Sequence, residues 1–166
     1  MNRGYYDRLL DEIGADTIAR YDREESGAQC FGTEEIDQDN GAFGFGALDR
    51  DRQAAILSAI DTNLPTRTKR PNEKTATSYG IKHAIERFTG FYVSNLQAKT
   101  AFRILGYQRS AYQLNPFYNI TLREWRAFSD LSAEIADRRS AARARVARRD
   151  EQRAAARYFY KLTKTA

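Results

Sequence analysis

The chain has 166 residues, enough for one hydrophobic core of ordinary size, and an apolar content of 42% excludes a wholly disordered protein. The amino terminus lacks the apolar stretch of a secretory signal, and no apolar run approaches the roughly 18 residues that span a bilayer. The single cysteine, Cys30, cannot form an intramolecular disulfide, so we expect a cytoplasmic protein with no membrane contact.

The two parts of the chain carry opposite charge. Residues 1–62 contain six Lys or Arg against fourteen Asp or Glu, a net charge of −8, whereas residues 63–166 have a net charge of +13. A basic region of this kind either binds a polyanion or docks against the acidic region, and the sequence leaves both interpretations open.

The acidic amino-terminal part, residues 1–61, is expected to be helical. A short amphipathic helix is predicted over 4–13 and ends at Gly14, and a second is predicted over about 16–24. Another helix is predicted over about 50–60, after an aspartate that suits the N-cap.

Residues 26–47 are rich in glycine and acidic side chains, which predicts a loop, with a short strand near Phe43 and Phe45. The acidic residues of this loop do not match the ligand spacing of an EF-hand, so a solvated loop is expected rather than a metal site. These residues are Glu34, Glu35, Asp37 and Asp39.

Residues 62–77 hold two of the three prolines and almost nothing apolar, which predicts a linker or an exposed arm. Residues 78–120 are expected to form a helix-turn-helix-like segment followed by an aromatic loop. Its helices are predicted over 79–88 and 95–105, the second with a capping box formed by Ser94 and Gln97.

The last part, residues 121–166, is expected to form one long Arg-rich helix. Thr121 and Glu124 make a second capping box, and no proline or glycine follows Leu122. The predicted fold is therefore mostly α, with a compact helical body and a long basic carboxy-terminal helix.

Side chains for catalysis are scarce. The chain has one histidine, His83, and one cysteine, so neither a zinc site of Cys and His nor a nucleophilic triad is expected. No glycine-rich phosphate-binding motif is present. We expect no enzymatic activity, no cofactor and no metal.

One face of the helix predicted over 95–105 has the side chains of a DNA recognition helix. Asn95, Lys99, Thr100 and Arg103 lie opposite its apolar face, and Arg, Lys and Asn side chains can pair with base edges in the major groove. An ordinary amphipathic helix exposing polar residues to water is the alternative.

The terminal helix has a one-sided basic stripe, which favours contact with a phosphate backbone. Its alternatives are solvated arginines, pairing with the acidic part of the chain, or a homodimer through this helix. The aromatic residues between Phe88 and Tyr118 offer rings for stacking on bases, although most are expected to build the core. The candidate contacts of the stripe are Arg138, Arg139, Arg143, Arg145, Arg149, Arg153 and Arg157.

The stretch SYGIKHAIERFTGFYVSN, with AFRILGY after it, resembles a segment of small accessory proteins of bacteriophages and mobile elements. The matching residues are Ser78, Tyr79, Gly80, Lys82, His83, Glu86, Tyr92, Val93, Ser94, Asn95, Gly106 and Tyr107. The resemblance implies a phage or bacterial setting and carries no functional residue over.

The sequence as a whole favours a non-enzymatic nucleic-acid-binding protein. The setting implied by the resemblance adds an alternative, namely an inhibitor or adaptor that binds a protein complex of the host, such as a CRISPR effector or a restriction enzyme.

Overall fold

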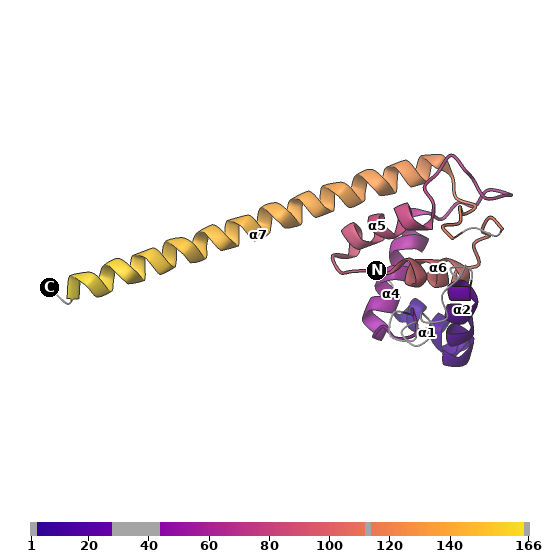
Figure 1. The fold of residues 1–166 in the computed structure, drawn as a ribbon, viewed down its shortest axis with the longest axis horizontal. Helices are drawn as coiled ribbons and strands as arrows, with labels where there is room; N and C mark the ends of the chain where they lie inside the picture. The colour runs from indigo at the N-terminus through magenta and orange to yellow at the C-terminus, as the bar shows by residue number, and fades with distance from the viewer. Residues whose placement is uncertain (1–2, 28–43, 112–113, 165–166) are drawn as a thin grey trace.

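A computed structural model describes residues 3–27, 44–111 and 114–164, and these residues are mostly helical (Figure 1). Of the six helices in this described part, five form a body, and the last begins on the body and projects far beyond it (Figure 1). The helices are α1 (Arg3–Ile13), α2 (Ala15–Gly27), α4 (Arg50–Asn63), α5 (Ser78–Thr89), α6 (Asn95–Ile104) and α7 (Leu122–Lys164).

The helix ends follow local signals in the sequence. Gly14 separates α1 from α2 with a backbone φ of 77°, a conformation that glycine adopts without strain. Asp49 caps α4 by accepting a hydrogen bond from the Arg52 backbone. The predicted capping box of α6 is confirmed, since Ser94 and Gln97 bond to each other's backbone N–H groups.

The strand predicted near Phe43 and Phe45 is wrong in the part that the structure describes, because residues 44–48 form bends and a turn. Phe45 is fully buried in the core, and its N–H donates to the Asp22 carboxylate at 3.0 Å instead of to a neighbouring strand. Phe43 and the four acidic residues of the predicted loop lie outside the described residues.

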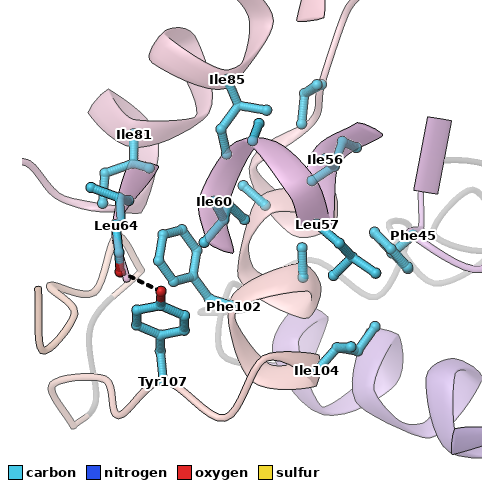
Figure 2. Close-up of a cluster of buried hydrophobic side chains, with 14 of the residues drawn as sticks. Phe45, Ile56, Leu57, Ile60, Leu64, Ile81, Ile85, Phe102, Ile104 and Tyr107 are labelled. Carbon is cyan, nitrogen blue, oxygen red and sulfur yellow. Dashed lines mark hydrogen bonds between the residues drawn. The ribbon is translucent and has the colours of Figure 1, made fainter. Parts of the chain in front are cut away.

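One hydrophobic core joins the acidic amino-terminal part to the later helices. Leu57 and Ile60 of α4 pack with Ile85 of α5 and Phe102 of α6 (Figure 2). The Tyr107 hydroxyl donates to the Leu64 carbonyl at the edge of this cluster (Figure 2). Residues 1–61 and 78–120, which the sequence divided at a linker, therefore share a single core in the described part of the chain.

The segment between α4 and α5 is tied to the chain that precedes α7. The Thr68 N–H donates to the Asn119 carbonyl at 2.8 Å, and the Asn72 N–H donates to the Tyr118 carbonyl at 3.0 Å. Arg67 forms an isolated β-bridge with Ile120. The predicted linker is thus a partly buried surface segment with backbone partners in the chain before α7.

The Glu86 carboxylate holds the connection between α5 and α6 in place. Glu86 Oε1 accepts hydrogen bonds from the Val93 N–H at 3.1 Å and from Lys82 Nζ at 3.4 Å, and Oε2 lies 2.7 Å from His83 Nδ1. Lys82, His83, Glu86 and Val93 therefore have a structural role here.

The first part of α7 packs on the body, and its later part does not. Phe128 and Ser132 are buried, and Arg139 is half-buried. Residues 141–154, which we call the free part of α7, are exposed at every position. Figure 1 shows this segment extending away from the five-helix body.

Candidate nucleic-acid interface

The polar face of α6, predicted to read DNA, is covered by α2. Lys99 is 1% exposed and Thr100 is fully buried. Lys99 Nζ donates to the Glu25 carbonyl at 2.7 Å, and the Thr100 hydroxyl donates to the Asp22 carboxylate at 2.7 Å. Burial lowers the pKa of Lys99 to about 8, against the opposing effect of the Glu25 charge.

The other two residues of that face are also occupied. Arg103 pairs with Glu24 and, at 3.3 Å, with Glu25 of α2, and the Asn95 amide donates to Asn115 Oδ1 at 2.9 Å. The exposed recognition face predicted for α6 is therefore wrong. Its basic side chains and Thr100 meet the acidic helix of the amino-terminal part, which is the docking alternative left open by the charge distribution.

Arg139 of α7 is a structural residue. Its guanidinium donates to the Arg87 carbonyl at 2.8 Å and to the Phe88 carbonyl at 2.9 Å, so it satisfies carbonyl groups at the end of α5. Gly90 follows with a φ of 87°, and a Cβ atom there would lie 2.7 Å from Arg139 Nη1. The prediction that Arg139 faces nucleic acid is wrong, because its donors are turned into the body.

The remaining arginines of the stripe are exposed wherever the structure describes their side chains. Arg138 pairs with Glu134 one turn earlier, and its side chain is 77% exposed. Within the free part of α7 the predicted contacts are all exposed, with Asp150 and Glu151 as its acidic residues. Arg157 lies on α7 beyond the side chains that the structure describes. The exposed contacts are Arg143, Arg145, Arg149 and Arg153.

The free part of α7 continues the face that packs on the body. At 100° per residue, Arg143, Val146 and Arg153 lie within about 40° of Arg139 around the helix axis. Arg143 also lines a groove of about 310 Å³ between the end of α5 and α7, with Gly90 and Tyr92 on the other wall. The arginines therefore begin at an inner corner between the helix and the body.

Two side chains near this corner are exposed: Tyr92, one of the aromatic residues that the sequence offered for stacking on bases, and Val146, which was not singled out in the sequence. Tyr92 is 68% exposed and Val146 is 57% exposed, whereas Phe102, Tyr107 and Tyr118 are buried as the core interpretation expected. No local signal in the sequence marks Tyr92 as exposed, since Phe91 and Val93, which follow the same Gly90 turn, pack on the core. Val146 has no local signal either, because its exposure depends on where the body ends.

The described part of the chain was also predicted to hold neither a metal site nor a membrane-spanning helix. His83 is held by Glu86 on the surface of α5, and no group of three or more His, Cys, Asp or Glu lies close enough there to hold a metal ion. None of the helices described has both the length and the apolar character needed to cross a membrane.

Comparison with known proteins adds no relative. No family model matches the chain, and neither the curated proteins nor the solved structures contain a match.

Proposed function

We propose that the chain is a non-enzymatic nucleic-acid-binding protein whose exposed α7 arginines contact the phosphate backbone. The observation that carries this proposal is that every residue from 141 to 154 is exposed, on a helix that leaves the body. Guanidinium groups that project into water from a rigid helix can replace the counterions of a nucleic acid without first leaving the packed body.

The inner corner supports the same proposal. Arg143 and the exposed ring of Tyr92 line one groove, so a backbone contact and a stacking surface lie side by side. Interleaved basic and aromatic side chains are typical of surfaces that bind single-stranded nucleic acid. The resemblance of residues 78–95 to phage and mobile-element proteins makes the bacterial cytoplasm the proposed setting.

The test is fluorescence anisotropy with labelled duplex DNA, single-stranded DNA and RNA across a salt titration. Affinity should fall steeply as salt rises. Replacing Arg145, Arg149 and Arg153 together by Ala should reduce the slope of log affinity against log salt by about 0.9 for each duplex phosphate that the variant no longer neutralises.

A matched control removes the same charge elsewhere. Arg8, Arg123 and Arg126 are exposed and lie outside the free part of α7, so the triple Ala variant at these positions should keep the slope. An equal reduction of the slope in both variants would attribute the effect to net charge alone and would contradict a defined interface.

A protein partner is the second candidate, and Val146 favours it. An apolar side chain 57% exposed at the centre of the arginine face resembles the apolar centre of a protein interface with a polar rim. An inhibitor or adaptor of a host defence complex, or a second copy of this chain, would bind with weak salt dependence and would lose affinity on Val146→Asp. Such a result in place of nucleic-acid binding would select this candidate.

A further inference from the structure

A second, separate feature is a cavity of about 280 Å³ where α2 meets α6. A water molecule occupies about 30 Å³ in the liquid, so this space has room for a small polyatomic ion. The cavity is lined by Glu25, Lys99, Arg103, Tyr107, Arg109 and Tyr118.

Two buried polar atoms of the cavity lining have no hydrogen-bond partner among residues 3–27, 44–111 and 114–164. They are the Tyr118 hydroxyl and Glu25 Oε2, and each of these residues is only 1% exposed. Leaving a buried polar group unpaired is unfavourable, and more so when the group is charged. Burial raises the pKa of Tyr118 well above its ordinary value, so this hydroxyl keeps its proton at neutral pH.

The charges around the cavity favour an anion. Arg103 and Arg109 both approach the same oxygen, Glu25 Oε1, at 3.3 Å and 3.5 Å. Lys99 is the third cation of the lining and uses one of its three N–H donors on the Glu25 carbonyl. Three cations therefore surround the Glu25 carboxylate. A second carboxylate, that of Glu24, also pairs with Arg103. With three positive and two negative charges counted, the group has a net charge of +1.

The unpaired atoms define the anion more closely. An ionised carboxylate oxygen only accepts hydrogen bonds, so the ligand must bring a donor to Glu25 Oε2 as well as acceptors for the cations and for Tyr118. Phosphate in its protonated forms has both, because a P–OH group donates while the other oxygens accept. Sulfate at neutral pH has no proton to donate.

We propose that this cavity is a binding site for inorganic phosphate, with the P–OH group donating to Glu25 Oε2 and the remaining oxygens accepting from Tyr118, Lys99 and the two arginines. The site uses groups of the body and no residue of the free part of α7. It is therefore independent of the proposed nucleic-acid surface.

Isothermal titration calorimetry and thermal unfolding of the whole chain test this site, with sodium phosphate and sodium sulfate at matched ionic strength. Phosphate should bind with one site per chain and raise Tm, whereas sulfate should do neither. Tyr118→Phe, which removes only the hydroxyl, should weaken phosphate binding about fivefold, as expected for one hydrogen bond. Arg52→Gln, an exposed change on α4, should leave it unaltered.

Glu25→Gln gives the second variant, because an amide can donate as well as accept. This variant should bind sulfate and phosphate with similar affinity. Titration with methyl phosphate at the same pH shows whether the site binds free phosphate alone or a phosphate ester as well. Equal effects of phosphate and sulfate on the unaltered protein, no phosphate binding at millimolar concentration, or unchanged binding by Tyr118→Phe would each overturn the assignment.

Discussion

Two helices of this chain, α6 and α7, present basic residues along one face, and these residues differ in whether another helix covers them. On α6 the cations lie against the acidic side chains of α2, whereas on the free part of α7 they project into water. The same residue types thus stabilise the body in one place and stay available in the other. A basic side chain stays accessible to a partner unless another helix of the chain places acidic groups opposite it, as α2 does for α6.

The largest expected effect comes from removing the available arginines altogether. A chain that ends after Ser140 keeps the buried residues of α7 and Arg139 but omits the free part. We expect its nucleic-acid affinity at low salt to fall by roughly a hundredfold or more, since phosphate contacts supply most non-specific affinity. Its unfolding free energy should stay within about 0.5 kcal/mol, because residues 141–154 are exposed throughout.

Anisotropy and urea denaturation, followed by circular dichroism, measure these two quantities on the same sample. Retained binding would place the interface on the body, whereas a large drop in stability would show that the body depends on the free part of α7.

The next effect concerns the contact between α2 and α6. The Asp22 carboxylate accepts from the Thr100 hydroxyl, the Phe45 N–H and the Gly46 N–H. Asp22→Ala should therefore lower the unfolding free energy by about 3 kcal/mol. The fluorescence of Trp125, which packs against the core, reports the transition in urea.

Asp130→Ala is the control for this change, since Asp130 is exposed on α7. It should alter stability by less than about 0.5 kcal/mol. Similar destabilisation by both substitutions would mean that the α2 carboxylate has no special role in holding α6.

A smaller effect separates two neighbouring arginines. Arg139→Met should cost about 1–2 kcal/mol of stability, because two carbonyl groups at the end of α5 lose their donor. Arg138→Met should cost only about 0.3 kcal/mol, since its partner Glu134 is exposed and one turn away. Guanidinium chloride unfolding of the two variants measures the difference, and equal values would contradict the structural role of Arg139.

The smallest effect is a pH dependence from Lys99. In the folded chain its pKa is about 8, whereas the ordinary value is 10.5, so the unfolded chain binds the extra proton between these values. Stability should therefore rise with pH from about 8 to 10 in the unaltered protein relative to Lys99→Met, by up to about 1 kcal/mol per pH unit. The contributions of Tyr107 and Tyr118, whose pKa values burial raises, act in both proteins and cancel in the difference.

Urea unfolding of both proteins across this pH range provides the measurement. A difference in stability that does not change with pH would mean that Lys99 stays protonated in the folded chain, paired more strongly than its burial suggests.

The helices were predictable where a local signal sets them. Gly14, Asp49 and the Ser94–Gln97 pair act within a few residues, so the sequence alone contains their geometry. The second predicted box, at Thr121, is present in part. Glu124 donates its backbone N–H to the Thr121 hydroxyl, but its carboxylate also accepts from the Thr66 N–H, a partner distant in sequence.

The candidate site was predictable only in part, because exposure is a property of the whole fold. Lys99 and Arg143 look alike as basic residues on amphipathic helices, and only the position of α2 distinguishes them. Likewise, Arg138 and Arg139 are adjacent, yet one turns to solvent and the other to α5. The clue in the sequence was the acidic run at the end of α2, which has the charges that α6 needs.

The span of the candidate arginines along α7 sets the size of a nucleic-acid footprint on this helix. From Arg143 to Arg157 the helix rises about 21 Å at 1.5 Å per residue. One turn of B-DNA extends about 34 Å, so these contacts of one chain would cover less than two-thirds of a turn of duplex. A footprint of a full turn or more in nuclease protection would therefore count copies of the protein, with at least two chains laid along the same stretch of nucleic acid.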